Sequence, residues 1–350
     1  MQIRPFLTAF FYCAVAASLA GCTSIGPRGI ELSRTDFNVA IQRTDAEQLL
    51  LNVVRQRYSD PVMFLDISSV SSSMSRSANL SLSGFFPQGL GSDSYNGGVG
   101  GSFSESPLVF YSPNTGERFV RQMLTPIDLR TLSLLLQSGW SIERVLLLGG
   151  ESIAGLSNSA TGDDSFRKLV DQLRILQRTE QLSFALETYG TVDVLVIIPA
   201  ASATTTAAYL EVCRLLQILP DGKPIRMQRA VGSRDATGNY LSIVTRSLFS
   251  SLYYLSNGVE PPVADTTSGV LQPRAIRGGI FDGGDLFKVR SSDSMPTNAA
   301  IRVRYRDRWF YVPDSDPDTR TTFALLSILL LLQSSDTTKM SPLISLSPSR

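Results

Sequence analysis

A strict alternation of polar and apolar residues marks the section between residues 68 and 111. From residue 73 to residue 83 every odd position holds a small polar residue, whereas the even positions are mostly apolar. A period of two is typical of a β-strand. After the turn-rich residues 87–94, larger and small residues alternate again from Tyr95. The pattern predicts a long β-hairpin that is rich in serine and glycine.

Apolar residues at helical spacing come before this hairpin. We expect Thr44 or Asp45 to cap the start of the helix, because short polar side chains accept hydrogen bonds from its first N–H groups. Residues 58–61 contain a turn sequence that ends it, and residues 22–43 have the composition of a tether. The residues that define the apolar face are Leu49, Leu50, Val53 and Val54.

Beyond Gly116, stretches with helical periodicity alternate with short apolar runs that are typical of strands. The segments expected to be helical are 118–124, 127–137, 166–178, 204–219 and 240–256. The segments expected to be strands are 144–148, 182–186, 192–198, 225–231, 287–290, 301–305 and 309–312. This alternation predicts an α/β or α+β domain in which helices lie on the faces of a mixed sheet.

Two segments depart from the alternation. Residues 260–284 are rich in proline and glycine and predict a long loop. Residues 323–332 are apolar almost all round, which a solvated helix does not tolerate. The run is too short to span a bilayer, so we expect this helix to be buried in the core or between subunits.

The N-terminal residues have the parts of a secretory signal. Arg4 supplies a positive charge, an apolar run extends to about Ala17, and small residues precede Cys22. The tetrapeptide Leu19-Ala20-Gly21-Cys22 resembles the lipobox of bacterial lipoprotein precursors. The resemblance implies that Cys22 receives a diacylglyceryl group, that residues 1–21 are removed and that the new amino terminus is acylated.

The residues after the lipobox indicate a destination. In well-studied lipoprotein families an aspartate there tends to retain the product in the inner membrane, whereas this chain has Thr23 and Ser24. An anchor on the periplasmic side of the outer membrane is therefore implied. Each buried methylene contributes about 0.8 kcal/mol, so two or more acyl chains hold a protein at a membrane without a transmembrane helix.

Length and composition set the domain organisation. The 350 residues, 43% of them hydrophobic, are enough for one large core or two smaller ones. The expected division is a signal peptide over 1–21, a tether over 22–43, the N-terminal helix plus hairpin over 44–115, the α/β core over 116–335 and a polar tail over 336–350. Within the tail, residues 343–346 have the composition of a short strand.

Charge and cysteine content exclude several classes of protein. The chain holds 32 basic and 31 acidic residues, and removal of the signal takes away one basic residue, so the mature chain is neutral and we expect no nucleic-acid partner. Cys13 lies in the signal and Cys22 is the lipid site, which leaves Cys213 as a buried small hydrophobe and allows no internal disulfide. Four arginines near Trp309 are expected on the outer face of an edge strand: Arg302, Arg304, Arg306 and Arg308.

The absence of histidine removes the commonest catalytic base and metal ligand. Gly150-Glu151-Ser152-Ile153-Ala154 follows an apolar run and resembles a nucleophile elbow, but the chain has no histidine partner for the serine. The same segment has the glycine spacing of a phosphate loop, with Leu156 where the lysine should be. We interpret it as a buried strand that ends in a glycine turn.

Two further motifs are incomplete. Ser165 and Lys168 have the spacing of serine acyltransferases, but no Lys-Thr-Gly element accompanies them, and Ser165 is better placed as the start of a helix. Asp314, Asp316 and Asp318 begin like a calcium loop but lack its turn glycine and closing glutamate. We expect these acids to form a solvated loop and a helix N-cap, with no metal and no cofactor.

The hairpin leaves two interpretations open. Between Ser68 and Ser104 its only charges are Arg76 and Asp93, and an isolated hairpin is only marginally stable in water. It is either a soluble arm that lies on its own domain or on a neighbouring subunit, or one of several copies that close into an outer-membrane barrel. Arg76 favours the first interpretation, because it falls on the apolar face that lipid would cover.

We therefore expect an outer-membrane-anchored lipoprotein facing the periplasm, a non-enzymatic structural or protein-interaction component of the cell envelope. The membrane anchor is at Cys22, and hairpin 68–111 contacts a protein partner or copies of itself. The alternative is an oligomeric outer-membrane pore or export component that inserts the hairpin. A third possibility is a hydrolase that uses Ser165 and Lys168.

Overall fold

The computed structural model describes residues 25–84, 95–159, 164–229, 239–271 and 286–334. The chain divides into two compact units. The smaller unit is Pro61–Thr125, and the larger combines Met1–Asp60 with Pro126–Arg350. The hairpin belongs to the smaller unit and all other strands to the larger.

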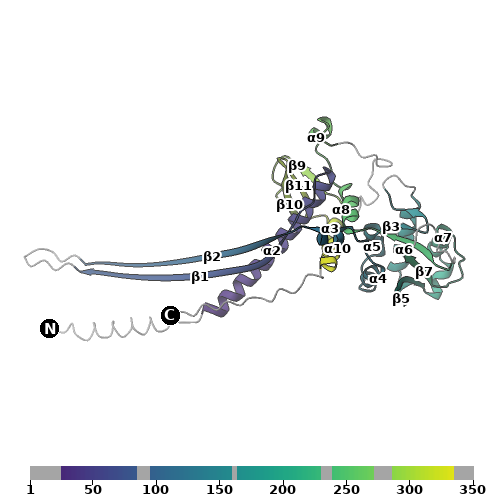
Figure 1. The fold of residues 1–350 in the computed structure, drawn as a ribbon, viewed down its shortest axis with the longest axis horizontal. Coiled ribbons are helices and arrows are strands. Elements are labelled where there is room, and N and C mark those ends of the chain that lie inside the picture. Colours follow the sequence, from purple (N-terminus) through teal and green to yellow (C-terminus); the bar gives the residue numbers. More distant parts are fainter. Residues whose placement is uncertain (1–24, 85–94, 160–163, 230–238, 272–285, 335–350) are drawn as a thin grey trace, which may run out of the picture. The chain divides into compact units, whose positions relative to one another are not determined.

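Helix α2, Ile25–Arg57, is the first element of the larger unit (Figure 1). Its predicted apolar residues are buried, which confirms the face inferred from the spacing. The chain reverses after the helix at Ser59, whose φ of 61° lies in the left-handed region, so the predicted end is also confirmed. Residues 34–40 on the N-terminal part are mostly exposed to solvent.

The predicted start of this helix was wrong. Thr44 does not cap it, because its hydroxyl donates to the carbonyl of Ile41 at 2.9 Å within the helix. The chain has no proline or glycine from residue 30 to Arg57, so nothing interrupts the helix between residue 30 and its buried part. The predicted tether over 22–43 is therefore helical from Ile25 onward.

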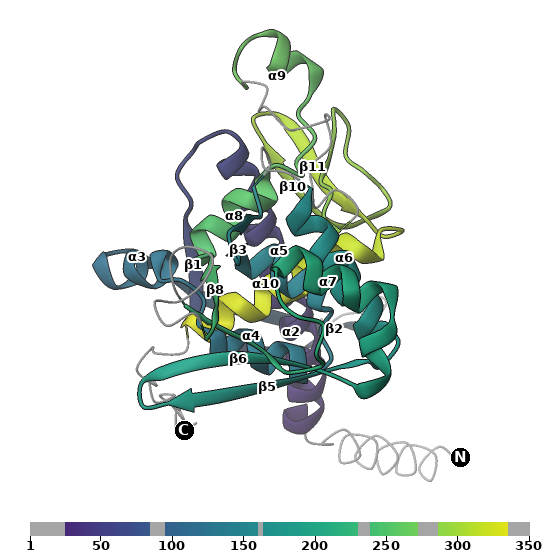
Figure 2. The same cartoon turned by 90° about the vertical axis from the view of Figure 1, so that its right-hand side faces the viewer.

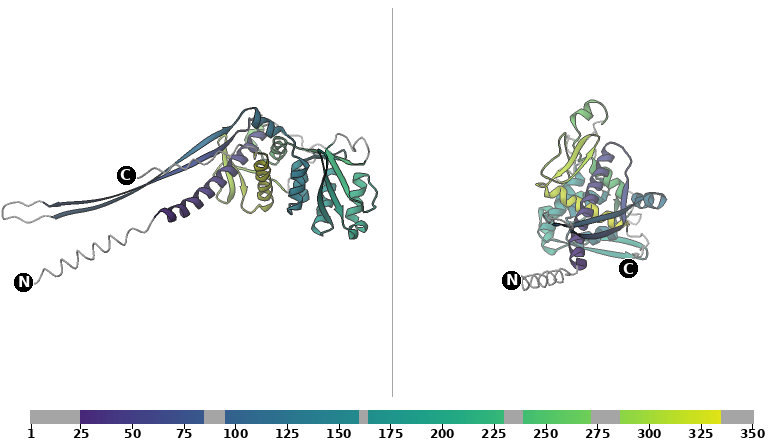
Figure 3. Two further views of the ribbon diagram at one scale, coloured as in Figure 1. Left: turned by 60° about the horizontal axis from the view of Figure 1, so that its bottom comes forward. Right: turned by 90° about the vertical axis from the view of Figure 1, so that its left-hand side faces the viewer.

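The smaller unit contains the predicted hairpin. Strand β1, Phe64–Gly84, pairs antiparallel with β2, Tyr95–Asn114, along its whole length, and a bulge interrupts the register between Ile67 and Ser69. Helix α3, Glu117–Leu124, follows as expected. The predicted turn over 87–94 lies outside the described residues. The two long strands are visible in Figures 1 and 3.

The main sheet of the larger unit is mixed and has six strands in the order β4-β3-β8-β7-β6-β5. Only β7 and β8 pair in parallel, and the remaining neighbours are antiparallel. The strands are β3 (Gly150–Ile153), β4 (Leu156–Ser157), β5 (Leu182–Tyr189), β6 (Val192–Pro199), β7 (Ile225–Arg229) and β8 (Leu241–Thr245). This architecture confirms the predicted fold class.

Helices cover this sheet (Figure 2). Residues 194–197 of β6 are all buried, and because alternate residues of a strand point to opposite faces, both faces are covered there. Helices α4 and α6 pack against β5, and α6 also packs against α7. The elements are α4 (Leu129–Gln137), α5 (Ile142–Gly149), α6 (Ser165–Arg178), η1 (Ala201–Thr205), α7 (Ala207–Leu216), α8 (Leu248–Ser256) and α9 (Val263–Thr267).

Three predicted elements need correction. The run 144–148 is part of helix α5 and not a strand, because a short and fully buried apolar run fits either structure. The predicted helix 240–256 is strand β8 followed by α8, which starts where the Ser247 hydroxyl accepts the N–H of Ser250 at 3.1 Å. The predicted helix 204–219 is shorter, since the Thr206 side chain caps α7.

A three-stranded sheet and a long helix complete the larger unit. Strands β9 (Arg290–Ser292), β10 (Ala299–Tyr305) and β11 (Arg308–Pro313) are arranged in the order β10-β11-β9. Helix α10, Pro317–Ser334, buries Phe323 and three leucines, which confirms the expected burial, although its last turn exposes Leu331. The region predicted as a loop contains α9, and its residues 272–284 lie outside the described part.

One glycine permits a close approach between α8 and the segment before β9. A Cβ atom on Gly258 would lie 2.5 Å from the carbonyl oxygen of Phe287 and 3.3 Å from that of Leu255. Both are backbone atoms, so the chain has to move to make room. The N–H of Val289 also donates to the Gly258 carbonyl at 2.9 Å.

We predict that Gly258→Ala lowers the free energy of unfolding by about 2 kcal/mol, because overpacking here displaces backbone. The control is Gly149→Ala, whose Cβ would meet a terminal methyl of Leu132 at 2.9 Å, an atom that rotates away. Urea denaturation followed by circular dichroism measures both. Equal stability losses for the two variants would contradict this account of Gly258.

Candidate functional site

The lipidation residue Cys22 lies outside the described residues, so its modification stays a prediction. Helix α2 starts three residues later, at Ile25. Among the residues that the structure describes, no helix is both long and apolar enough to cross a bilayer.

The register of the hairpin brings the small polar positions of its two strands onto one face. The alternation in β1 is Ser73, Ser75, Ser77, Asn79, Ser81 and Ser83, and the positions opposite are Ser106, Ser104, Ser102, Gly100, Gly98 and Asn96. Residues directly opposite each other in an antiparallel pair share a face. This polar face therefore contains only serine, asparagine and glycine across both strands.

The other face of the hairpin is apolar over most of the same length. Its central pair is Leu80 opposite Val99, with Leu82 opposite Gly97 toward the turn. The exception is at the base, where Arg76 is opposite Phe103 and the next pair is Met74 opposite Glu105. Arg76 and Glu105 are thus at diagonal positions in the register of the two strands.

Each strand of the hairpin has one partner only. In the part of the chain that the structure describes, β1 and β2 form a two-stranded sheet and no third strand joins either of them. Half of the backbone groups of each strand therefore point away from the partner strand. A row of such groups is a template for pairing with another chain.

The segment that resembles a nucleophile elbow has a different geometry. Ser152 lies within β3, opposite Ser157 on one side and Val244 on the other. The turn comes later, at Ala154 and Gly155, whose φ angles of 50° and 83° form a two-residue hairpin turn. An elbow or a phosphate loop needs a strand followed by a helix, whereas here helix α5 precedes β3.

The serine–lysine pair lies on helix α6. Ser165 is its first residue, as predicted, and the N–H of Lys168 donates to the carbonyl of Asp164 at 2.9 Å. The Lys168 side chain is exposed. A lysine that activates a serine lies in a desolvated pocket or beside another cation, and an exposed position provides no desolvation.

Two of the three aspartates at the start of α10 act in capping and pairing. Asp316 accepts the N–H of Thr319 at 3.0 Å and its hydroxyl at 2.7 Å, which confirms the predicted helix cap. Asp318 pairs with Arg144 on α5. No group of three metal-ligating side chains occurs among the described residues.

A buried arginine that the sequence did not indicate joins α5, β3 and the residue that follows β4. Arg246 donates to the carbonyls of Leu147 at 2.8 Å and Gly150 at 2.7 Å and also to the carbonyl of Asn158. Its guanidinium lies over the Tyr254 ring at 4.0 Å. Burial lowers the pKa of Arg246 from its usual value. The partial negative charge at the end of α5 stabilises this cation.

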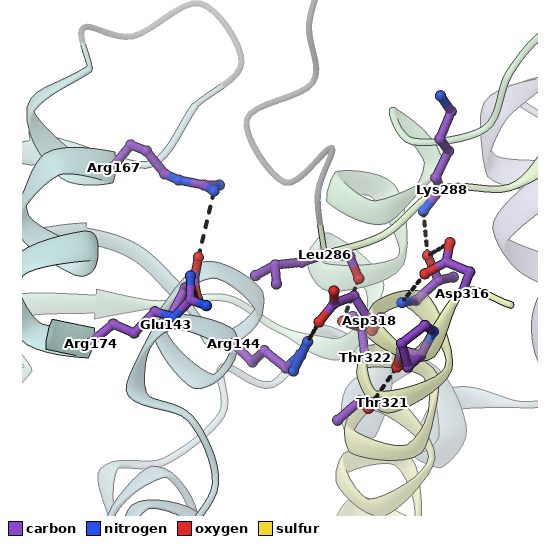
Figure 4. A network of polar contacts seen from close by, with 12 residues as sticks. Glu143, Arg144, Arg167, Arg174, Leu286, Lys288, Asp316, Asp318, Thr321 and Thr322 are labelled. Carbon is purple, nitrogen blue, oxygen red and sulfur yellow. Dashed lines mark hydrogen bonds and ion pairs between the residues drawn. The ribbon is translucent and has the colours of Figure 1, made fainter. Parts of the chain in front are cut away.

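A buried carboxylate joins α5 to α6 (Figure 4). Glu143 is 2% exposed and pairs with Arg174 at 3.0 Å and with Arg167 at 3.5 Å. Burial raises the pKa of Glu143, although the two arginines act in the opposite direction. The sequence contained no local signal for this site, because both partners lie on another helix.

A second polar cluster joins the end of α2 to the turn between β10 and β11. Asp60 accepts hydrogen bonds from the Tyr305 hydroxyl and from Arg306, the latter at 3.0 Å. The Tyr58 ring lies edge-on to Tyr305 at 5.4 Å and carries Arg306 over its face at 4.9 Å. The Tyr58 hydroxyl donates to Asp265. Hydrogen bonding from Tyr305 lowers the pKa of Asp60, and burial raises the pKa of Tyr58.

The other three arginines near Trp309 bind groups within the protein. Arg304 pairs with Asp307 at 3.0 Å, and Arg308 pairs with Asp293. Arg302 donates to the carbonyl of Pro296 at 2.8 Å. Arg302 and Arg304 lie on the edge strand β10, as predicted, whereas Arg308 belongs to the central strand β11.

Cys213 is a buried residue of α7 and forms no disulfide, as the sequence predicted. It is 2% exposed, and burial raises the pKa of its thiol. The neighbouring Tyr209 also lies in the core, where burial raises its pKa to about 12. A buried neutral thiol of this kind is inert.

The chain matches no protein-family model, and no curated protein or solved structure is significantly similar to it. Among the described residues, the two strands of the hairpin are the longest strands that have one partner strand each.

We predict that Asp60→Asn lowers the free energy of unfolding by about 1 kcal/mol at pH 7, a value discounted because the side chain is 33% exposed. The folded-state pKa of Asp60 is below its unfolded value of about 4, so its stabilisation is present above pH 4 and is lost as the pH falls through the folded pKa. The difference between variant and wild type in urea denaturation should therefore shrink progressively as the pH falls below about 4.

The control for this prediction is Asp307→Asn. Asp307 pairs with Arg304 but its side chain is 93% exposed, so its replacement should change stability by less than about 0.5 kcal/mol at any pH. A pH-independent loss in Asp60→Asn would show that its carboxylate charge is not the stabilising group.

Proposed function

We propose that this protein is a lipoprotein anchored through Cys22 to the periplasmic side of the outer membrane, where it serves as a non-enzymatic structural component of the cell envelope. It acts through protein contacts made by the hairpin, with copies of itself or with a partner. The observation that carries the proposal is the two-stranded arm of 21 and 20 residues, which no third strand joins among the described residues.

The dimensions of the hairpin support a role in contacts. At about 3.3 Å per residue its strands extend for roughly 66 Å. A two-stranded ribbon is marginally stable alone, so an arm of this length gains stability from a surface that packs against it or pairs with it. The base of the same unit exposes apolar residues, among them Phe110, Tyr111, Val120 and Leu124. Exposed apolar groups of this size are typical of interaction surfaces.

The chemistry of the larger unit supports a non-enzymatic role. Two of its buried charged groups, Arg246 and Glu143, bind backbone carbonyls or other side chains and stabilise the packing of helices and strands. The hydrolase alternative needs an activated serine, and the lysine one helical turn from Ser165 is exposed. The chain has no histidine that could take the place of this lysine.

We predict that Cys22→Ala yields a chain without acyl groups, because the thiol that receives the lipid is absent. Mass spectrometry of the purified protein should show the loss of the lipid mass, and fractionation should show less protein in the outer membrane. Cys213→Ala is the matched control, since its thiol is buried in the core and the lipid signal is intact. An unchanged lipid mass in Cys22→Ala would refute the anchor.

The contact proposal is tested with a photoreactive amino acid at Ser77 in the hairpin of the full chain in living cells. Illumination should give a cross-linked product whose second component, identified by mass spectrometry, is an envelope protein or this chain. The control position is Leu134, which is 54% exposed on α4 and should give no such product. Absence of a product at Ser77 and at further hairpin positions would contradict a role of the arm in protein contacts.

A further inference from the structure

We infer that the partner of the hairpin is the hairpin of another copy of this chain, and that several copies close into a β-barrel whose apolar face lies in the lipid of the outer membrane. This inference rests on the proposed function and identifies its partner. The observations that carry it are the register of β1 and β2, the length of the apolar band and the position of the charged residues.

The two faces of the hairpin have the composition of a barrel wall. Transmembrane barrels alternate apolar residues toward lipid with polar residues toward a water-filled interior. The register places serine, asparagine and glycine on one face of both strands, while the pair Leu80–Val99 lies at the centre of the other face. A hairpin lying on its own soluble domain requires no such agreement between the two strands over this length.

The apolar band has the length of a membrane span. On β2 it extends from Tyr95 to Phe103, and on β1 it extends from Gly84 to Arg76. This is about nine residues, and a tilted transmembrane strand needs ~9–11. Aromatic residues border the apolar band of outer-membrane barrels at both interfaces, and here Tyr95 and Phe103 are at its two ends.

The charge of Arg76 was the argument against placing the apolar face in lipid. Its position in the register shows that this charge lies at the end of the apolar band. Arg76 is opposite Phe103, at the end of the band, where the penalty for arginine is smallest. Glu105, the nearest charge of β2, is its diagonal neighbour one step further toward the base. The rest of the band, from Ser77 to Gly84 and from Tyr95 to Ser102, contains no charged residue.

Backbone hydrogen bonding is the reason why the hairpins of several copies would form a closed ring. A strand edge within lipid leaves N–H and C=O groups without partners, so only closed barrels are viable there. The outer edge of β1 in one copy can pair antiparallel with the outer edge of β2 in the next, because every hairpin presents one edge of each strand. A ring of such copies has an even number of strands and no remaining edge.

The test uses the full-length lipidated protein, purified in detergent and added to planar bilayers of phosphatidylethanolamine and phosphatidylglycerol. We expect a discrete oligomer by native mass spectrometry and stepwise ionic currents. Leu80→Arg places a charge in the middle of the lipid-facing band and should reduce channel events at least ~30-fold. Ser81→Arg, on the other face of the same strand, should keep the channels and shift their selectivity toward anions.

The outcomes separate this inference from the proposed function. An oligomer that gives no current overturns the barrel and leaves self-association through the hairpin intact. Failure to form any oligomer or channel, together with no cross-linked product at Ser77, overturns both. Equal effects of Leu80→Arg and Ser81→Arg on currents would also refute the barrel, and Leu82→Arg repeats the test at a second lipid-facing position.

Discussion

Backbone hydrogen bonding constrains the smaller unit of this protein more than any side chain does. A strand has donors and acceptors on both sides, and a two-stranded sheet satisfies one side only. The hairpin satisfies the inner side over its whole length and leaves the outer side open. Water can bind these outer backbone groups. The edge of another strand can also bind them.

In the larger unit, side chains bind backbone carbonyls that would otherwise lack hydrogen-bond partners in the core. Helix α5 ends inside the core, where its last carbonyls would lack partners. Arg246 and Asn158 supply the donors, and Ser251 adds a hydrogen bond to the carbonyl of Leu148 at 3.0 Å. The cost of burying a guanidinium is offset by several charge-assisted hydrogen bonds, the nearby helix dipole and the ring of Tyr254. These hydrogen bonds fix the position of the strands around α5.

The two units are thus suited to different tasks. The larger is a packed mixed α/β body whose ion pairs, such as Glu143 with Arg174, connect neighbouring helices. The smaller carries small polar positions on one side of a two-stranded ribbon and apolar positions on the other, and residues 77–84 and 95–102 contain no charge. Self-association would satisfy the strand edges and the apolar face together, because closing a ring pairs the backbone and directs the apolar face to lipid.

The sequence by itself determined the elements whose pattern is local. The hairpin, the buried face of α2, helix α6, the β10–β11 pair and the cap at Asp316 follow from periodicity and turn chemistry within short windows. The same local patterns misassigned the run 144–148, since a buried apolar run of that length has no polar face to define a period. They also misplaced the start of α2. Its N-terminal residues are mostly exposed, and an exposed helical segment has the polar composition of a tether.

Only the tertiary structure decided the features that join distant residues. The carbonyl of Gly150 binds Arg246 from 96 residues away, and nothing in the sequence around either residue indicates the pair. The register of the hairpin also joins residues that are distant in the sequence. Each strand showed its own alternation in the sequence. Which residues of β2 oppose Ser77 or Arg76 depends on the pairing and on the bulge between Ile67 and Ser69. A shift of one residue would have mixed the two faces, so the single polar face is a property of the folded chain.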